Sequence, residues 1–413
     1  MDNEYIVSLG LAAKAASTEI SRASTAQKNS ALEAIARLLV EHSNEITAAN
    51  KLDLEYAAAK GIPAPMLDRL KLDDKRIAGI ADSLNELIKL ADPVGSGSRT
   101  TRPNGLVIEN IRVPLGVVAI IYEARPNVTV DAAALCIKTG NACILRGGSE
   151  AINTNRALTQ LMRDALCEVG LPADSVALVN DTSRESATAL MKLRGYIDLL
   201  VPRGGAGLIR SVVENAEVPV IETGAGNCHI YVDESADLDM AIKVTLNAKL
   251  SRPSVCNAAE TLLVHKNIAA RFLPAFKSAL THELVIRGCE RTRALIDCEA
   301  ADESDWVTEY DDYILAVRVV DSLDEAIAHI SRYSTKHSEA IITRSMESAD
   351  RFRSEIDAAA VYVNASTRFT DGGEFGFGAE LGISTQKLHA RGPMGLDALT
   401  TNKYLVTGNG QIR

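Results

Sequence analysis

Apolar residues recur at helical spacing through the first ninety-five or so residues of the chain. The clearest apolar faces occupy residues 31–39 and 80–88, where leucine, isoleucine and alanine return every three or four positions. The turn-forming sequence Gly61-Ile62-Pro63 interrupts this pattern. We therefore expect a set of helices here, with an independent helical bundle as the alternative.

After residue 114 the pattern changes to short apolar runs that alternate with helical segments. The runs lie at 116–122, 142–145, 176–179, 197–201 and 218–221, with helical patterns at 128–138 and 157–169. Strands that are apolar on both faces and alternate with helices are typical of a parallel, doubly wound α/β sheet. Such sheets bind ligands at the carboxyl ends of their strands, and a dinucleotide-binding domain is the leading interpretation.

A second α/β segment follows, with apolar runs at 261–264, 314–320 and 340–342. Between the helices and the first sheet, residues 106–113 read as a strand after the turn Pro103-Asn104-Gly105, and 403–408 is a natural partner for it. We predict three parts: a dinucleotide domain (1–98 and 114–233), a catalytic domain (234–395) and an oligomerisation arm (99–113 and 396–413). An arm with exposed strand edges needs a partner, which predicts a homo-oligomer.

One cysteine stands out from the other six. Cys256 lies among small and polar residues in 251–261, directly before the apolar run at 261–264, and Pro253 keeps a helix from reaching it. A thiol in a short turn before a core strand is held firmly and can face a cleft. Buried structural cysteines are also common, so both a catalytic and a structural role fit this local pattern.

Composition narrows the class of protein. A net charge of −10 over 413 residues argues against general affinity for nucleic acid or anionic membranes. No apolar run approaches the roughly 18 residues of a membrane span, and the acidic amino terminus lacks a signal-peptide pattern. Seven cysteines without a Cys-x-x-Cys pair suit a reducing cytoplasm. No metal site is expected, since His389 lies apart from other metal-ligating residues.

Four segments together resemble the aldehyde dehydrogenase superfamily over nearly the whole chain, and most closely its gamma-glutamyl phosphate reductase family. They are Tyr122-Glu123-Ala124-Arg125-Pro126-Asn127-Val128-Thr129, Val201-Pro202-Arg203-Gly204-Gly205, Ser251-Arg252-Pro253-Ser254-Val255-Cys256-Asn257, and residues 374–385. The resemblance implies an aldehyde-dehydrogenase-like fold. It also implies reduction of an acyl phosphate to glutamate 5-semialdehyde in proline biosynthesis, through a thioester on Cys256.

The resemblance also implies roles for individual residues. Cys256 would be the nucleophile, Asn127 the oxyanion-hole amide, and Glu222 the carboxylate that is the general base in aldehyde-oxidising relatives. Glu309 matches the contact to the nicotinamide ribose. Arg146 stands where relatives carry a lysine for the adenine ribose, and Gly147-Gly148-Ser149 follows without an acid for the 2′-hydroxyl, which favours NADPH over NADH.

Further candidates complete the expected site. For the cofactor they are Ser149, Gly204 and Gly205, although the glycine signal is weak alone. For the anionic substrate they are cations and hydroxyls: Arg125, Arg252, Lys387, Arg391, Ser384 and Thr385. Two alternatives stay open, a hydrolytic aldehyde dehydrogenase that uses Glu222 as base and a non-catalytic cofactor-binding protein. The labile substrate also raises the question of a transient contact with glutamate 5-kinase.

Overall fold

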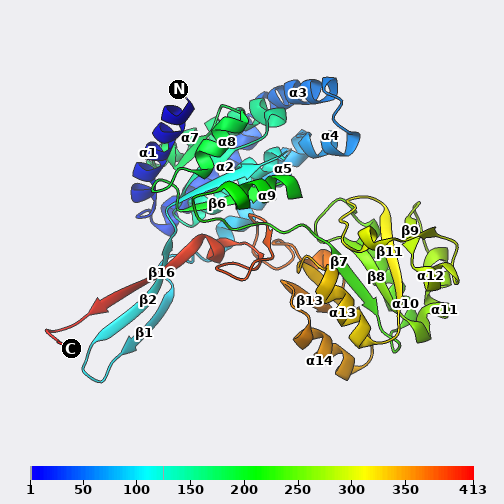
Figure 1. Ribbon diagram of the computed structural model, residues 1–413. Helices are drawn as coiled ribbons and strands as arrows, with labels where there is room; N and C mark the ends of the chain where they lie inside the picture. The colour runs from blue at the N-terminus through cyan, green and yellow to red at the C-terminus, as the bar shows by residue number, and fades with distance from the viewer. Residues whose placement is uncertain (1, 124) are drawn as a thin grey trace. The chain divides into compact units, whose positions relative to one another are not determined.

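The computed structural model describes residues 2–123 and 125–413, and the side chains of all of these except residues 2, 3, 64 and 65. Met1 and Ala124, which fall within the predicted dinucleotide domain, lie outside the described residues. The chain forms two compact units (Figure 1). The first comprises Met1–Thr223, Gly376–Gly382 and Met394–Arg413, and the second comprises Gly224–Phe375 and Ile383–Pro393.

The first unit begins with the predicted helices, α1 (Asp2–Ile20), α2 (Thr25–Glu41), α3 (Ser43–Ala59), α4 (Ala64–Leu70) and α5 (Asp74–Lys89). The side chains of Ser24 and Asp73 cap α2 and α5 by accepting hydrogen bonds from backbone N–H groups in the first turn. The apolar face predicted at 31–39 is buried. Because α2 packs on α7 (Ile152–Glu168) of the neighbouring α/β layer, these helices are not an independent bundle.

The first unit contains a parallel four-stranded sheet in the order β5-β4-β3-β6. Its strands are β3 (Val117–Tyr122), β4 (Ala142–Arg146), β5 (Val176–Leu178) and β6 (Leu199–Arg203), and its helices are α6 (Pro126–Lys138), α7, α8 (Arg184–Met191) and α9 (Ala206–Asn215). Val117, Ala119 and Ile121 share a core with α1, α8 and α9. The alternating Val118 and Ile120 are also fully buried, and α6 contacts the same strand, so helices cover both faces as predicted.

One predicted strand is nearly absent. In 218–221 the structure has a single bridge, Leu200 to Val220, rather than a strand. The backbone N–H of Leu200 donates to Pro219 O (2.8 Å), and Leu200 O accepts from Ile221 N (3.1 Å), but Pro219 has no N–H with which to extend the ladder. Val218 and Ile221 are buried, as the apolar pattern indicated, whereas Pro219 is exposed and ends the ladder.

The predicted arm is an antiparallel sheet in the order β1-β2-β16. It consists of β1 (Gly97–Thr101), β2 (Val107–Pro114) and the tail strand β16 (Thr400–Thr407) (Figure 1). The register runs from Thr400 opposite Pro114 to Thr407 opposite Val107. The predicted pairing of the tail with residues near 107 is confirmed.

The second unit contains a parallel seven-stranded sheet in the order β10-β9-β11-β8-β7-β12-β13. The strands are β7 (Cys228–Val232), β8 (Ala259–His265), β9 (Val285–Gly288), β10 (Glu299–Ala300), β11 (Ile314–Val320), β12 (Ser338–Ile342) and β13 (Ala360–Val363). The helices are α10 (Leu238–Leu250), α11 (Lys266–Ser278), α12 (Glu290–Arg293), α13 (Leu323–Tyr333) and α14 (Met346–Glu355). A hairpin of β14 (Ile383–Ser384) and β15 (Gly392–Pro393) completes the sheet structure described here.

Successive side chains along β8 point to opposite faces of the sheet and pack in two different cores. Leu262 and Val264 pack with α10 and α11, whereas Leu263 packs with α13 and α14. The units divide after Thr223, ten residues before the boundary that the pattern suggested at 233, because β7 pairs with β8 and β12. Within the described residues, no helix is long and apolar enough to cross a membrane.

Candidate active site

The thiol predicted as nucleophile lies in the turn that joins α10 to β8, in the second unit. The turn is closed by a hydrogen bond from Ala258 N to Val255 O (2.9 Å), and Cys256 is partly exposed. The thiol of Cys228, at the start of β7, donates to Cys256 O (3.2 Å). The local geometry predicted for Cys256, a held turn before a core strand, is therefore present.

Gly226 brings a second backbone segment against this turn. A Cβ atom at position 226 would overlap the carbonyl oxygen of Cys256, so only glycine fits there. The N–H of Gly226 donates to Glu309 Oε1 (2.7 Å). Burial raises the pKa of Glu309, and the Gly226 bond partly offsets this. Glu309 is therefore bound to the 224–226 loop, which also contacts the backbone of Cys256.

The same loop contacts Thr385, one of the two predicted hydroxyl donors. Gly224 N donates to Ile383 O (2.9 Å), and a Cβ atom at 224 would overlap the side chain of Thr385. Ser384 is fully buried, and its hydroxyl accepts from Gln386 N (3.3 Å). Thus Thr385 belongs to the surroundings of the 224–226 loop, while Ser384 is held inside the hairpin.

A buried ion pair brackets the turn. Lys249, at the end of α10, and Glu260, at the start of β8, lie 2.5 Å apart, Nζ to Oε2, and both are almost fully buried. Burial raises the pKa of Glu260 to about 8 and lowers the pKa of Lys249, while each side chain favours the charged form of the other. The pair fixes the two ends of the segment that contains Cys256.

Lys249→Met is therefore expected to lower the free energy of unfolding by about 3–5 kcal/mol, because it leaves a buried carboxyl group without its partner. Urea denaturation followed by circular dichroism measures this. The matched control is Lys266→Met, which removes the exposed Lys266–Asp321 pair and should change stability by less than about 1 kcal/mol. Equal losses in the two variants would contradict a special role for the buried pair.

Two predicted substrate-binding cations, Lys387 and Arg391, converge on one carboxylate. Asp357 accepts from Lys387 (3.0 Å), Arg391 (2.9 Å) and Lys336 (3.2 Å). Hydrogen bonds from these cations hold the pKa of Asp357 well below its usual value. Three cations around one acid leave an excess of positive charge, and Arg391 Nε and Nη2 are buried without a hydrogen-bond partner. This cluster suits an anionic group.

In the first unit, Asn127 is the second residue of α6, and Arg125 is its half-buried N-cap residue. Asn127 Nδ2 donates to Asp131 Oδ2 (2.9 Å), one helical turn further on. Burial raises the pKa of Asp131 to about 6. Since one amide hydrogen of Asn127 is held by Asp131, the orientation of this side chain is fixed.

Arg146 ends β4, as predicted, but it already has partners. Its Nη2 donates to the carbonyl oxygens of Thr182 (2.7 Å) and Ser183 (2.8 Å), and its buried Nε has none. Burial lowers the pKa of Arg146, and among the acids the charge of Glu150 opposes this most strongly. Gly147-Gly148-Ser149 supplies no acid for the 2′-hydroxyl, as predicted, but the next residue is Glu150. Ser149 starts a short 3-10 helix, and the carboxylate of Glu150 lies against Gly148, within electrostatic range of Arg146.

Gly204 and Gly205 immediately precede α9, where a phosphate was expected. The N–H of Gly205 donates to Glu123 Oε2 (3.0 Å), and that carboxylate also lies against Gly204. An anionic oxygen thus occupies the start of this helix. Glu222 is half-buried near the end of the first unit, and its neighbour Thr223 donates to Pro202 O (2.9 Å).

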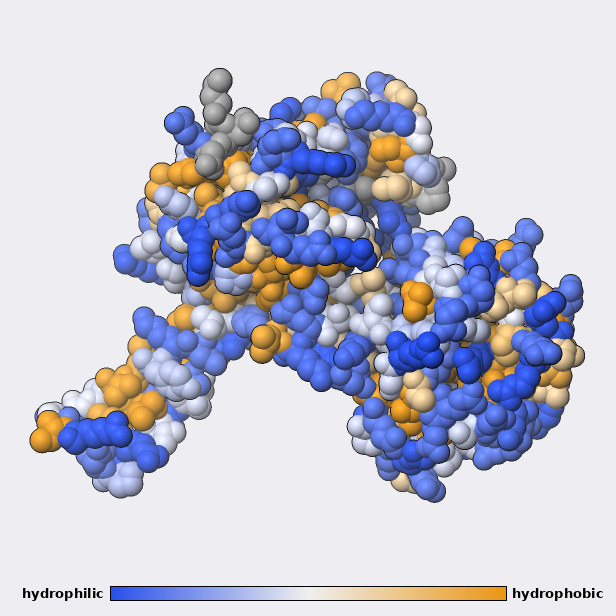
Figure 2. Space-filling view, in the orientation of Figure 1, coloured by the Kyte–Doolittle hydropathy of each residue, from blue (hydrophilic) through white to orange (hydrophobic). Residues whose placement is uncertain are grey.

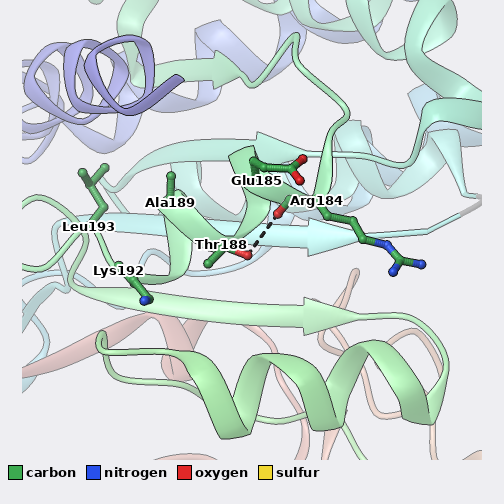
Figure 3. A pocket seen from close by; sticks show the side chains of 6 residues that line it. All are labelled: Arg184, Glu185, Thr188, Ala189, Lys192 and Leu193. Carbon is green, nitrogen blue, oxygen red and sulfur yellow. Dashed lines mark hydrogen bonds between the residues drawn. The ribbon is translucent and has the colours of Figure 1, made fainter. Parts of the chain in front are cut away.

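An open pocket of about 470 Å³ lies along α8 and the turn after it (Figure 3). Thr188 Oγ1 donates to Arg184 O (3.0 Å), and the remaining lining residues are Glu185, Ala189, Lys192 and Leu193. None of the predicted site residues lines this pocket. Among the described residues, no group of three or more His, Cys, Asp or Glu side chains could hold a metal ion.

The candidates divide between the two units. Cys256, Glu309 and Thr385 meet around the 224–226 loop, and Lys387 and Arg391 meet at Asp357. Three residues near these candidates were not predicted: Asp131, Asp357 and Arg368. The side chain of Arg368 bonds to both ends of the Cys256 turn. Asn127 and Asp131 lie four residues apart at the start of α6, and this spacing is a local signal from which their contact could have been predicted. Arg368 has no such signal.

Comparisons with known proteins agree with this architecture. Residues 2–295 match the family model described as the aldehyde dehydrogenase family. Gamma-glutamyl phosphate reductases from Clostridium perfringens and Halothermothrix orenii are 60% and 57% identical to this chain, covering 100% and 99% of both partners in each pair. The crystal structure of gamma-glutamyl phosphate reductase from Thermotoga maritima has a TM-score of 0.96 and 50% identity, covering 99% of each chain.

Proposed function

Because the chain belongs to the aldehyde dehydrogenase family, and within it to the gamma-glutamyl phosphate reductases, we propose that it reduces γ-glutamyl phosphate with NADPH. The products are glutamate 5-semialdehyde and phosphate, and the reaction is a step of proline biosynthesis. The observation that carries the proposal is the partly exposed Cys256, held in a turn before a core strand.

The chemistry begins at Cys256. Its thiolate attacks the γ-carbonyl carbon, the sulfur–carbon bond forms, and the carbon–oxygen bond to phosphate breaks, which leaves a thioester. Bound NADPH supplies the hydride that reduces this thioester. Collapse of the resulting thiohemiacetal releases the aldehyde and returns the thiolate. An ordinary thiol is only about 3% ionised at pH 7, so nearby positive charge assists the first step.

Two further residues act around the reacting carbon in this proposal. Asn127 donates its amide hydrogen to the oxyanion, and Asp131 keeps that amide oriented. No water needs activation in the reductive direction, so Glu222 assists proton transfer at the thiohemiacetal rather than serving as a hydrolytic base.

The cofactor would be held mainly by the first unit. The buried Nε of Arg146 has no partner, which suits a donor to the adenine ribose or its phosphate, with Ser149 beside it. The N–H groups at Gly204 and Gly205 suit the cofactor phosphates, which would compete with Glu123 for this position. Glu309 is proposed for the nicotinamide ribose.

The substrate candidates suit a molecule with two anionic ends. The cations at Asp357 suit the α-carboxylate, with Thr385 and Ser384 nearby on the same hairpin. Arg125 and Arg252 remain candidates from the family segments that contain Asn127 and Cys256. These assignments rest on charge and position.

The reaction run backwards tests the proposed function, because the forward substrate is labile. Glutamate 5-semialdehyde and NADP⁺ are supplied with and without inorganic phosphate, and NADPH formation is followed by absorbance. Phosphate-dependent NADPH formation is the expected result. Turnover that is indifferent to phosphate would instead indicate the hydrolytic dehydrogenase with Glu222 as base, and no turnover would overturn the substrate.

We also propose a homo-oligomer assembled through the arm. The residues of β16 after Thr400 are exposed, including the large side chains Tyr404, Leu405 and Val406, and the hydrophobic surface of the arm is visible in Figure 2. Edge strands with exposed apolar residues pair with another chain unless they are covered.

Deleting residues 403–413 is expected to give monomers, because it removes most of the outer strand of the arm. Size-exclusion chromatography with light scattering measures the mass. The control is Lys403→Ala in the full chain, which keeps the strand and should keep the assembly. A truncated protein with the same oligomeric mass as the parent would contradict the role of the arm.

We further propose that the protein acts in the cytoplasm. No disulfide links cysteines in the described part of the chain, which suits a reducing compartment. A transient contact with glutamate 5-kinase would shorten the exposure of the acyl phosphate to water. Crosslinking the two enzymes during turnover would test this contact.

A further inference from the structure

Arg368 spans the turn that contains the nucleophile. It lies in a short 3-10 helix, Thr367–Phe369, after β13. Its Nε donates to Ser251 Oγ (3.1 Å), and its Nη1 donates to Asn257 Oδ1. Ser251 precedes Cys256 by five residues and Asn257 follows it directly, so the guanidinium bridges both ends of the turn.

Asn257 is held to the same segment by its other polar atoms. Its Nδ2 donates to Thr370 O (2.9 Å) and to Arg368 O (3.3 Å), and its backbone oxygen accepts from Thr367 Oγ1 (2.7 Å). Both Asn257 and Thr367 are buried. The backbone around Arg368 is therefore fixed against the backbone around Cys256, and the position of the guanidinium is set by the fold.

The charge of Arg368 is not matched by an ion pair. Among the described residues, no carboxylate lies within salt-bridge distance of its guanidinium, although the side chain is half-buried. Burial and the nearby charge of Arg252 lower the pKa of Arg368, whereas the acids Asp371 and Glu374 and the thiol of Cys256 favour its charged form. Two arginines thus lie within electrostatic range of each other beside a thiol.

We propose that Arg368, with Arg252 as a second cation, binds the phosphate group of the acyl phosphate beside Cys256. This inference rests on the proposed function and names the residue that meets the leaving group. Only one oxygen atom separates phosphorus from the carbon that Sγ attacks, so the phosphate must lie close to the thiol. A guanidinium has five N–H donors, of which the contacts to Ser251 and Asn257 use two. The remaining donors suit phosphate oxygens, as arginine forks commonly do.

The position also assists the chemical step. When sulfur bonds to the γ-carbon and the carbon–oxygen bond breaks, the electron pair leaves on the phosphate, and its negative charge increases next to Arg368. In the resting enzyme the same cation stabilises the thiolate. One residue thereby favours both the ionised nucleophile and the departing anion.

The test uses the full-length protein and inorganic phosphate as the probe. Iodoacetamide alkylation of Cys256 is followed by mass spectrometry of its peptide, with and without phosphate. Phosphate is expected to slow alkylation of the parent. In Arg368→Gln this protection should require at least about 10-fold more phosphate, which corresponds to about 1.4 kcal/mol. Arg368→Lys should recover part of the protection by phosphate. This variant also keeps the proposal testable if Arg368→Gln folds poorly.

Arg353→Gln is the matched control, since Arg353 is an exposed arginine of α14 that pairs with Asp350 (3.1 Å). Its protection by phosphate should equal that of the parent. A purely structural Arg368 would change the alkylation rate without changing the phosphate concentration needed for protection, which would overturn the proposal. So would a parent that phosphate does not protect.

Turnover gives a second, separable readout. In the reverse reaction, Arg368→Gln should raise the KM for phosphate at least about 10-fold, with the KM for NADP⁺ changed by less than about 2-fold. If the parent is protected by phosphate but shows no phosphate-dependent turnover, the phosphate site stands and the proposed function fails. An unchanged KM for phosphate in an active Arg368→Gln enzyme overturns the site alone.

Discussion

Cys256→Ser is expected to lower reductase turnover by at least about 10³-fold while leaving the fold and cofactor binding intact. A serine hydroxyl is far less acidic than a thiol and a poorer nucleophile, so the step that forms the thioester is lost. The hydroxyl is close in size to the thiol and partly exposed here, and the turn itself is held by Ala258, Asn257 and the Lys249–Glu260 pair. Loss of activity without loss of stability is therefore the predicted combination.

The measurement is the reverse reaction with phosphate, together with fluorescence titration of NADPH and a melting curve. Cys167→Ser is the matched control, because Cys167 is an exposed cysteine on α7, in the other unit. It should keep full turnover. A Cys256→Ser enzyme with more than a few per cent of parent activity would show that the thiol is not the nucleophile, whatever the relatives use.

The features of the nucleophile that sequence predicted were local ones. The turn, the strand after it and the end of the helix before Pro253 all depend on neighbouring residues, and the structure contains each of them. The same holds for the parallel strands β3, β4, β8 and β11, whose continuous apolar runs mark burial on both faces. The tail at 403–408 was predicted as a strand that pairs with the arm near residue 107, and β16 pairs with β2 in that way.

The features that sequence did not give are long-range. Arg368 meets Asn257 across 111 residues, and no local pattern marks that arginine. Asp357 was missed for the same reason, although two of the cations it binds were selected as candidates. Sequence can indicate which residue types gather in a segment. It does not indicate which acid will neutralise which cation, because that depends on loop geometry at the amino edge of the sheet.

Glu150 illustrates how a local argument can also fail. The residues directly after Arg146 contain no acid, and the cofactor argument relied on that. Glu150 follows Ser149 directly, and its carboxylate lies against Gly148, within electrostatic range of Arg146. The preference for NADPH therefore rests on the relatives and on the charge of Arg146, and no longer on an absent carboxylate.

Asn127→Ala is expected to lower kcat by about 10²–10³-fold with little change in the KM for the aldehyde, the effect of losing one oxyanion donor. Developing negative charge on the γ-oxygen needs a donor that is oriented before the reaction begins. Asp131 supplies that orientation, because its half-buried carboxylate accepts one amide hydrogen of Asn127 and leaves the direction of the other fixed. An effect confined to kcat distinguishes this role from substrate binding.

Steady-state kinetics of the reverse reaction at saturating phosphate measure the effect, with Asn215→Ala as the matched control. Asn215 is an exposed asparagine at the end of α9 whose amide donates only to Ser211 O within its own helix (2.7 Å), so its loss should leave kcat unchanged. Asp131→Asn distinguishes the orienting role of Asp131 from the hydrogen-bond donation of Asn127 to the oxyanion. It keeps the size of the side chain but removes the charged acceptor, so kcat should fall by less than in Asn127→Ala, again with KM unchanged. If Asn127→Ala instead raises KM and spares kcat, the amide binds substrate in its ground state and the oxyanion role is wrong.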